Sequence, residues 1–305
     1  VPGAEETKNK GDFIMKLMGY KRENGRYGIR NYLLIIPASV CSSETCVNIA
    51  KLVNGAIAIP HQHGCCEIGD DFDTTKRTLI GFGKNPNVGA VLVVGLGCEG
   101  IQAKEIADGI SESGKPVEYI VIQEEGGTCK TVARGAEIAG KMARELAKQN
   151  KVEFDISEIV LGLECGGSDP TSGLASNPAI GVASDMLVAE GGSSILSETT
   201  ECIGAEHLLA ERFVNDIEKE KFLSMVKRVE DRSYAAGHDL REGQPTPGNK
   251  AGGLTTIEEK SLGCMHKAGK STFMGALEYA EEIPYDKKGL YFMDTPGQDI
   301  DSITG

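Results

Sequence analysis

The sequence predicts an α/β protein with a doubly wound, mostly parallel sheet, helices on both of its faces, and a more irregular helical and loop part toward the C-terminus. Six short apolar runs recur along the first two thirds of the 305-residue chain, as buried strands of a parallel sheet do. Amphipathic stretches separate these runs, which is the alternation typical of α/β proteins. Many of the 39 glycines follow the runs directly, where a strand turns tightly into a helix.

The expected strands are residues 31–37, 55–61, 90–97, 117–123, 158–165 and 193–198. The clearest helix is expected over 128–150, because one apolar stripe runs through Val132, Ala136, Ala139, Met142, Ala143 and Leu146.

The strand and helix alternation weakens after residue 198. There the sequence predicts charged helices over 205–234, a loop over 238–253, a helix over 257–265 and a final strand that runs into a turn. We therefore expect three regions: a leader and basic segment at 1–30, a Rossmann-like domain at 31–204, and a helical and loop region at 205–305. The last region is expected to lead into a truncated or continuing second α/β unit.

Charge and composition exclude several classes of function. The 32 basic and 45 acidic residues give a formal net charge of −13, which argues against a nucleic-acid partner. No apolar run is long enough to cross a membrane, and no secretory signal opens the chain. Nine cysteines, an odd number, favour reduced thiols and a cytoplasmic protein over a disulfide framework.

Ligands of an open parallel sheet bind outside the carboxyl ends of its strands, so the residues that follow each run are the candidate site. They are Ser39, Cys41, His61, His63, Cys65, Cys66, Glu67, Cys98, Glu99, Glu124, Glu125, Cys129, Glu164, Cys165, Ser168, Asp169, Glu198 and Glu201. Imidazole and thiolate ligands favour iron or zinc, whereas carboxylates favour a hard cation.

Three thiols on separate loops, Cys65, Cys98 and Cys165, are predicted to bind a metal. Three thiolates with an open fourth position suit a single iron or an iron–sulfur cluster. The alternative is that these cysteines are small packing residues and that carboxylates hold a hard cation.

Residues 95–100, GLGCEG, match the glycine pattern of a dinucleotide-binding turn. This match leaves a nicotinamide-dependent oxidoreductase as an alternative function. The other interpretation is a tight turn whose glycines let strand and helix pack closely.

Two basic segments are candidate anion sites in this acidic chain. One lies directly before the first strand, and the other lies in and after residues 248–263, with its charges at Lys250, Lys260, Lys267 and Lys270. Arginine binds a carboxylate through two parallel hydrogen bonds, so a carboxylate substrate is the expected anion. The predicted substrate-binding residues are Arg26, Arg30, Asn31 and Lys260, and the alternative is a solvated turn.

Several motifs, in order along nearly the whole chain, carry a family resemblance. They are GYKRENGRYGIRN (19–31), IIPASVC (35–41), HQHGC (61–65), GLGCE (95–99), ECGGSDPTSGLASNPAIG (164–181), GNKAGGLTTIEEKSLG (248–263) and MDTPGQDIDSITG (293–305). The chain thereby resembles the altronate and galactarate dehydratase family, which includes the large subunit of sulfolactate sulfo-lyase. The doublet Cys65–Cys66 departs from the single cysteine that is common in that family.

The resemblance implies a metal-dependent hydro-lyase, typically stimulated by iron, that removes water from a sugar acid to give a 2-keto-3-deoxy acid. The cofactor it implies is Fe²⁺, with an iron–sulfur cluster or Mn²⁺ as alternatives. His61 and His63 are then the candidate base and acid, or one of them a metal ligand. The carboxylate candidates are Glu99, Glu164, Asp169 and Glu198.

Family members usually carry a small β-rich domain ahead of this region, fused or as a separate subunit, and continue beyond the DTPG motif. This chain shows neither, so we expect the central part of such an enzyme and a homo-oligomer. The alternatives are a non-catalytic or partner-dependent large subunit, including one that releases sulfite.

Overall fold

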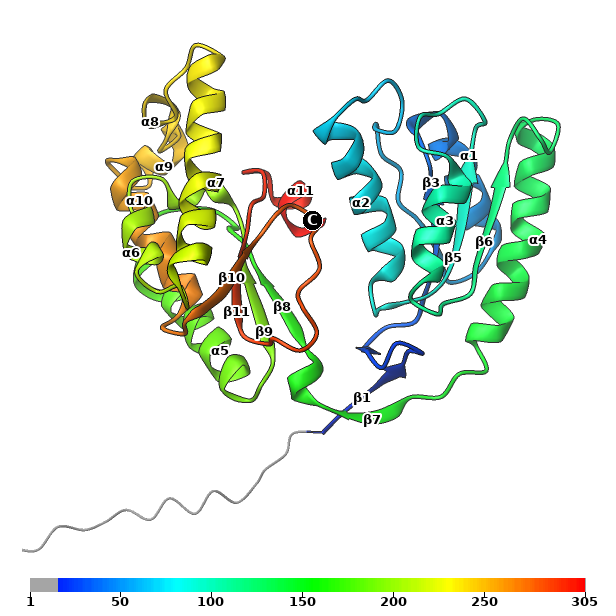
Figure 1. The fold of residues 1–305 in the computed structure, drawn as a ribbon, viewed down its shortest axis with the longest axis horizontal. Helices are drawn as coiled ribbons and strands as arrows, with labels where there is room; N and C mark the ends of the chain where they lie inside the picture. Colours follow the sequence, from blue (N-terminus) through cyan, green and yellow to red (C-terminus); the bar gives the residue numbers. More distant parts are fainter. Residues whose placement is uncertain (1–15, 305) are drawn as a thin grey trace, which may run out of the picture.

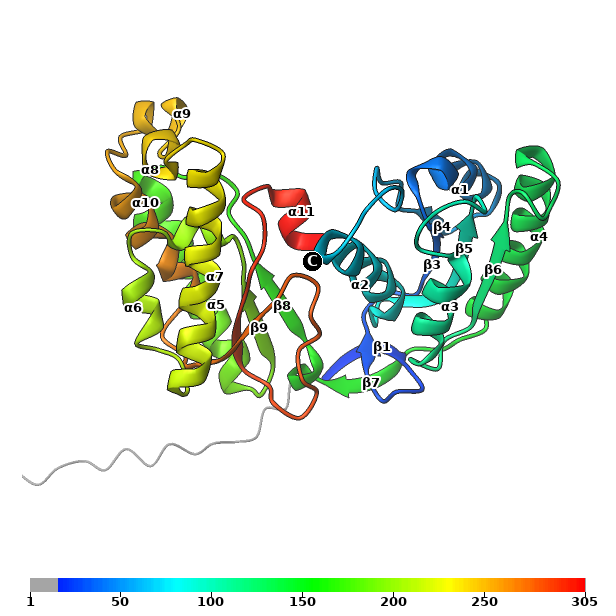
Figure 2. The same ribbon diagram turned by 45° about the horizontal axis from the view of Figure 1, so that its top comes forward.

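The computed structural model describes residues 16–304, which form two parallel sheets with their helices, and a short antiparallel sheet between them (Figure 1). Residues 1–15 of the predicted leader lie outside the described residues. Figure 2 shows the same two units side by side after a rotation of 45°. The predicted α/β class is confirmed.

The first parallel sheet has the strand order β4-β3-β5-β6. Its strands are β3 (Tyr32–Pro37), β4 (Ala56–Ala58), β5 (Val88–Gly95) and β6 (Val117–Val121). The helices between and after them are α1 (Val40–Leu52), α2 (Asp70–Lys84), α3 (Ala103–Ser111) and α4 (Thr128–Leu146). The order reverses between β3 and β5, and this switch point is where a doubly wound sheet binds its ligands.

Alternate residues of β3 enter two separate cores, one on each face of this sheet. Leu33 and Ile35 pack with the side chains of α1 and α4, whereas Leu34 and Ile36 pack with those of α2 and α3. A strand that is apolar on both faces must be covered on both faces. The predicted doubly wound arrangement is therefore present in this unit.

The second parallel sheet has the order β10-β11-β9-β8. Its strands are β8 (Val160–Leu163), β9 (Ser193–Leu196), β10 (Phe273–Leu277) and β11 (Leu290–Met293). Its helices are α5 (Asn177–Ala189), α6 (Glu206–Ala210), α7 (Asp216–Ala235), α8 (Leu240–Gly243), α9 (Pro247–Ala251), α10 (Ile257–Cys264) and α11 (Asp299–Thr304). Four shorter helical turns, η1 to η4, cover Ile156–Glu158, Ser172–Ser176, Thr199–Cys202 and Met265–Ala268.

Helices cover one face of the second sheet, where Phe222 of α7 packs against Phe213 and Phe292. The opposite face packs against the connection between β10 and β11, which contributes Ile283 to a smaller core (Figure 1). An antiparallel sheet of β1 (Lys16–Lys21), β2 (Tyr27–Gly28) and β7 (Val152–Asp155) leads from the first unit into the second.

The prediction of a single sheet domain over 31–204 is wrong. Residues 160–163 and 193–196 form β8 and β9, which pair with each other and through β11 with β10, not with the first four strands. Their apolar runs resemble those of the first sheet, and strand pattern alone does not tell which sheet a buried strand joins. The chain divides near β7 instead of at residue 204.

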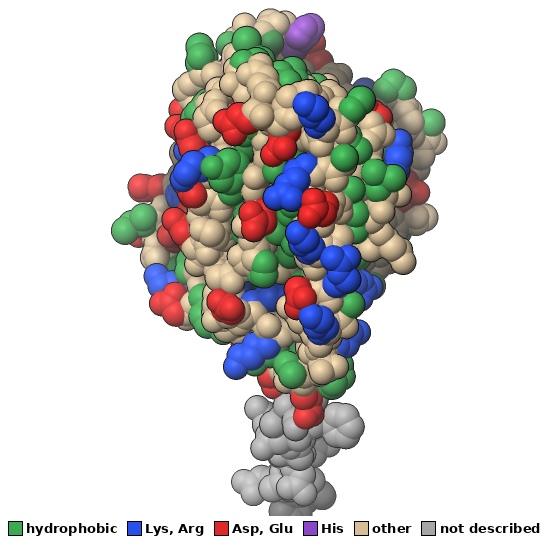
Figure 3. Space-filling view, turned by 90° about the vertical axis from the view of Figure 1, so that its right-hand side faces the viewer, with side chains coloured by type: hydrophobic (Ala, Val, Ile, Leu, Met, Phe, Trp, Pro, Cys, Tyr) green, Lys and Arg blue, Asp and Glu red, His purple; other side chains and the backbone are tan. Residues whose placement is uncertain are grey.

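The face of the first unit that carries α4 shows basic and acidic side chains interspersed (Figure 3). On α4, Glu137 pairs with Arg134 at 3.0 Å and with Lys141 at 2.9 Å, the spacing that places opposite charges on one helix face. Among residues 16–304, no helix combines the length and apolarity needed to span a bilayer.

Gly181 of α5 allows close backbone packing against η4. A Cβ built there would stand 2.1 Å from the His266 carbonyl oxygen, so Gly181→Ala is expected to lower the free energy of unfolding by about 1–3 kcal/mol. Gly81→Ala on α2 is the matched control, because no atom lies within 4 Å of its Cβ, and it should stabilise by about 0.4–1 kcal/mol. Urea unfolding of both variants tests this, and a similar effect at both sites would contradict the packing.

Candidate active site

The first group of predicted site residues lies in the loops after β3, β4 and β5. The Val40 N–H at the start of α1 donates to the His63 carbonyl oxygen at 2.8 Å, which fixes the β4 loop beside that helix. Gly64 in this loop has φ +90 and lies against the Ala38 carbonyl oxygen, a conformation and an approach that only glycine allows. We call the loop of residues 61–67 the histidine loop.

His61 holds the histidine loop in place. Its Nε2 lies 2.8 Å from the Pro37 carbonyl oxygen, which can only accept, so Nε2 carries the proton. Its Nδ1 accepts from the His63 backbone N–H at 3.2 Å. Burial lowers the pKa of His61 and keeps the ring neutral. Both ring nitrogens are therefore engaged in structure.

His63 has a free nitrogen instead. Its Nδ1 lies 3.2 Å from Glu67 Oε1, and its Nε2 has no partner within residues 16–304. The His63 side chain is 60% exposed and that of Glu67 only 16%. A carboxylate on one imidazole nitrogen fixes the orientation of the ring, so the free Nε2 is placed to accept a proton from a ligand in the cleft. Glu67 is one of the candidate residues that follow the strand ends, and its position four residues after His63 is the sequence signal for this contact.

Glu99 braces the turn after β5. Its buried Oε2 accepts the backbone N–H groups of Leu96 at 3.0 Å and Gly97 at 2.7 Å. These are N–H groups that a dinucleotide-binding turn would offer to a pyrophosphate. The N–H groups of the turn at 95–100 are thus already bound by the Glu99 carboxylate, which disfavours the nicotinamide-dependent alternative.

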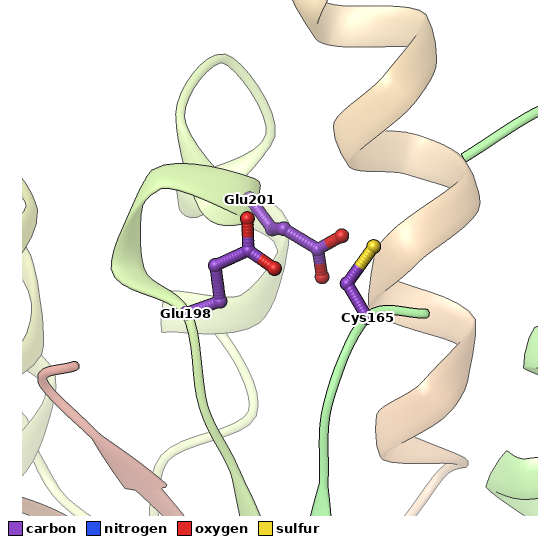
Figure 4. Close-up of side chains that lie close together, drawn as sticks. All are labelled: Cys165, Glu198 and Glu201. Carbon is purple, nitrogen blue, oxygen red and sulfur yellow. The ribbon is translucent and has the colours of Figure 1, made fainter. Parts of the chain in front are cut away.

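The second group of site residues lies after β8 and β9. Cys165, Glu198 and Glu201 each place a ligand atom within 4.8 Å of the other two, and we call them the second-sheet cluster (Figure 4). Both glutamates are buried, and Glu198 has a left-handed backbone with φ 67. Such backbone strain is found where the surroundings over-determine a functional position.

The charges of this cluster are only partly balanced. Glu201 forms a buried ion pair with Lys267 and accepts a hydrogen bond from Cys264 Sγ at 3.0 Å. Burial alone would raise the pKa of Glu201, and the Lys267 ammonium outweighs it and lowers that pKa. Burial, with help from the Glu201 charge, raises the pKa of Glu198 to about 8. Burial likewise raises the pKa of Cys165 to about 11.

Glu164 lies beside the second-sheet cluster. Its Oε2 accepts hydrogen bonds from the hydroxyls of Ser197 and Ser302, whereas its buried Oε1 has no partner in the described chain. Thr295 links this arrangement to the cluster, because its Oγ1 accepts the Glu198 backbone N–H at 2.6 Å and lies 2.7 Å from Ser302 Oγ.

These residues fit a divalent metal ion. Three carboxylates and the Lys267 ammonium leave a net charge of −2 when all are ionised, and an unpaired buried carboxylate oxygen is costly without a cation. Carboxylate oxygens with one sulfur suit Fe²⁺ or Mn²⁺. Cys165, Glu198 and Glu201 would hold the ion, with Glu164 beside it.

A cleft of about 1670 Å³ separates the two units and is lined from both of them. His61, His63 and Glu67 lie on one wall, and Thr200 and Thr295 on the other. Seven carboxylates against three guanidinium groups leave the lining with a net charge of −4: Glu67, Asp70, Asp71, Asp73, Glu278, Asp294 and Asp301 against Arg77, Arg228 and Arg232. An anionic ligand in such a cleft needs a cation.

The predicted metal site of Cys65, Cys98 and Cys165 does not form. Cys65 and Cys98 follow strands of the first sheet, and Cys165 follows a strand of the second. The cause is the division into two sheets, which the strand pattern does not reveal. Within the described residues only Cys165 belongs to a close group of potential metal ligands.

The prediction that Arg26 and Arg30 face the same crevice is also wrong, and Asn31, predicted to bind substrate with them, does not line the cleft either. Arg30 and Asn31 precede β3 and so lie at its amino end, one strand length of about 20 Å from the histidine loop. Arg26 donates to the Ile283 carbonyl oxygen at 3.2 Å and stacks on Tyr285. A basic segment that precedes a parallel strand lies at the amino end of that strand, opposite the edge where ligands bind. These residues therefore contact other parts of the chain and not a ligand.

Of the two remaining predicted site residues, Asp169 closes a local turn, whereas Lys260 lies near the second-sheet cluster. Asp169 is exposed and accepts from Thr171 Oγ1 at 2.7 Å and from the Ser172 N–H at 2.8 Å, which closes a local turn. Lys260 lies near enough to Glu198 for its charge to oppose the rise in the pKa of that carboxyl. Of the four predicted substrate-binding residues, Lys260 alone is beside the second-sheet cluster.

Titratable groups follow the carboxyl ends of strands in both parallel sheets, and a cleft lies between the two units, an arrangement typical of enzyme sites in α/β proteins. Comparisons with known proteins agree with the division into two units. Residues 19–147 match the second domain of D-galactarate dehydratase/altronate hydrolase, and residues 156–305 match the C-terminal domain of D-galactarate/altronate dehydratase.

The chain is 39% identical over 290 residues to the (2R)-sulfolactate sulfo-lyase subunit beta of Chromohalobacter salexigens, which covers 94% of the chain and 73% of that relative. It is 36% identical to the altronate dehydratase of Bacillus subtilis and 35% identical to that of Escherichia coli, covering 92% of the chain each time. The chain belongs to the D-galactarate/altronate dehydratase family of lyases. It spans 58% of the length of these two altronate dehydratases.

The raised pKa of Glu198 predicts a pH-dependent stability of the metal-free protein. Between the ordinary value of 4.5 and about 8, the folded state binds more protons than the unfolded state, so stability falls as the pH rises through this window. The glutamine of Glu198→Gln stays neutral at every pH. The melting temperature of this variant should therefore rise relative to that of the wild type as the pH increases through this window. Below the window, the difference between the two melting temperatures should be constant.

Melting curves of the metal-free wild type and variant at several pH values test this prediction. Glu190→Gln is the matched control, because Glu190 is exposed at the end of α5. A difference between wild type and Glu198→Gln that is independent of pH would contradict the buried, protonated carboxyl.

Proposed function

We propose that this chain carries the active site of a metal-dependent hydro-lyase that removes water from a sugar acid of the altronate or galactarate type. The product is a 2-keto-3-deoxy acid. The observation that carries the proposal is the cleft between the two units, with His63 and Glu67 on one wall, and on the other Thr200 and Thr295, which neighbour Glu198 of the second-sheet cluster. Membership in the dehydratase family supports it.

The chemistry requires removal of a weakly acidic proton beside a carboxylate. A divalent ion, for which we propose Fe²⁺ with Mn²⁺ as the alternative, would stabilise the negative charge that develops on the substrate carboxylate and 2-hydroxyl. An iron–sulfur cluster on Cys65, Cys98 and Cys165 is not part of the proposal, because these thiols follow strands of two different sheets.

His63 is the proposed base. Its Nε2 takes the C2 proton, and Glu67 holds the resulting imidazolium at Nδ1. His61 positions the histidine loop and exchanges no proton, because both of its nitrogens are engaged.

Glu164 is the proposed acid. Burial and the charge of Glu201 raise the pKa of Glu198 to about 8, with a smaller contribution from the neighbouring Glu164. Ser197 and Ser302 orient Glu164, whose unpartnered Oε1 can deliver a proton to the departing 3-hydroxyl. Lys260 is the proposed contact for the substrate carboxylate.

A second candidate is the elimination of sulfite in place of water. The observation that favours it is the 39% identity to a sulfolactate sulfo-lyase subunit beta, of which the chain covers 73%. That name also supports a partner subunit for this chain, and the small β-rich domain or subunit expected from the sequence is the proposed partner. Assays with altronate, galactarate and (2R)-sulfolactate, with and without such a partner, separate the two reactions.

The proposed base predicts the effect of three substitutions. His63→Gln should lower the rate of C2 proton exchange and of dehydration by about 100-fold or more, which is what a general base supplies. Glu67→Gln should lower both less, and His207→Gln, at an exposed histidine of α6, should leave both unchanged.

The exchange of the substrate C2 hydrogen for deuterium, followed by nuclear magnetic resonance with Fe²⁺-loaded anaerobic protein, measures the first step directly. Circular dichroism confirms that each variant is folded. Full exchange activity in His63→Gln would contradict the assignment of the base.

A further inference from the structure

The histidine loop contains two adjacent thiols that the proposed reaction does not use. Cys65 and Cys66 are both exposed, and their sulfur atoms lie 3.8 Å apart. They stand between His63 and Glu67, the two residues whose contact orients the proposed base. A change in their spacing therefore acts on the segment that joins base and carboxylate.

We propose that Cys65 and Cys66 are an oxidative modification site, at which a hydroperoxide converts the two thiols to a disulfide and separates His63 from Glu67. The effect on catalysis rests on the proposed function of His63, whereas the formation of the disulfide does not.

The reaction balances with one hydroperoxide molecule. The two S–H bonds and the O–O bond break, and one S–S bond and two O–H bonds form. With hydrogen peroxide the products are the disulfide and two molecules of water, so the sulfurs are oxidised and the peroxide oxygens are reduced. The first thiolate attacks the peroxide to give a sulfenic acid, and the second displaces hydroxide from it.

The two sulfurs share one hydrogen bond. This bond with Cys66, followed by the charge of a Cys66 thiolate, raises the pKa of Cys65. One thiol of the pair meets the peroxide as its thiolate, and the adjacent thiol closes the disulfide.

The geometry of the loop makes the disulfide both disruptive and reversible. The sulfurs must move from 3.8 Å apart to about 2.05 Å apart. Adjacent Cα atoms across a trans peptide are about 3.8 Å apart, below the usual disulfide range of about 4.4–6.8 Å, so the bond forms under strain. Strained disulfides are easily reduced, which suits a switch and not a structural bond. Cys66 already has a left-handed backbone with φ 61.

Two other exposed thiols, Cys41 and Cys98, are close enough to compete with Cys66 for a disulfide with Cys65. Charges on Cys41 and Cys98 also raise the pKa of Cys65, although less than Cys66 does. Within the described residues, only the Cys65–Cys66 pair has its two sulfurs in hydrogen-bond contact. This contact is why the adjacent pair is the proposed site.

The test treats the metal-free chain with one equivalent of hydrogen peroxide and maps its peptides by mass spectrometry. The peptide that contains residues 61–67 should lose the mass of two hydrogen atoms and regain it with dithiothreitol. Cys66→Ser should abolish this loss, and Cys129→Ser, at an exposed thiol at the start of α4, should not. A disulfide to Cys41 or Cys98, or peroxide treatment that leaves both thiols free, would overturn the site.

A second readout follows the imidazole of His63 by nuclear magnetic resonance, with His63→Gln used to assign its signal. Oxidation should shift that signal in the wild type and not in Cys66→Ser. In the metal-loaded enzyme, the same oxidation should lower C2 exchange by about 100-fold, and dithiothreitol should restore it. An unmoved His63 signal in fully oxidised protein would overturn the switch. A moved signal in a protein without dehydratase activity would refute the proposed function alone.

Discussion

The buried ion pair between Lys267 and Glu201 is the interaction on which the second-sheet cluster depends. The Lys267 side chain is 1% exposed and that of Glu201 is 2% exposed, so neither charge is stabilised by water. Loss of one partner of such a pair typically costs about 3–5 kcal/mol, because the other is left charged and buried. Lys267 is therefore what lets Glu201 remain ionised beside two further carboxyls. Of those two, Glu198 has its pKa raised to about 8 by burial and by the charge of Glu201.

The same charges bear on the proposed reaction. The lining of the cleft carries a net charge of −4, and Lys260 near the cluster does not reverse this. A divalent ion at the cluster would supply the positive charge that the proposed anionic substrate needs.

Much of the architecture is predictable from the sequence, because it is local. The first four apolar runs form the first sheet, and the periodic stripe at 128–150 forms α4. The strand ends also identify most of the groups at both sites, including His63 and Glu198. The local pattern does not reveal that β8 and β9 find their partners at 273–293, since pairing over such a distance has no local signature. Because β8 and β9 were assigned to the first sheet, Cys65, Cys98 and Cys165 were predicted to lie together.

Three further features could not be predicted from the sequence pattern, each for a different reason. Arg26 and Arg30 carry the right charge, but the direction of β3 sends them to the wrong edge of the sheet. The roles of His61 and His63 depend on which nitrogen faces Pro37 and which faces Glu67, and only three-dimensional contacts decide that. Lys267 was one lysine among several in a basic segment until the fold buried it against Glu201.

The position of the metal ion tests this account most directly. Crystals of protein loaded with Fe²⁺ without oxygen, measured at the iron absorption edge, would locate the ion by anomalous scattering. The account predicts one peak enclosed by Cys165, Glu198 and Glu201, next to the free Oε1 of Glu164. A peak among the thiols of the first sheet, or iron-loaded active protein with no peak at the second-sheet cluster, would contradict it.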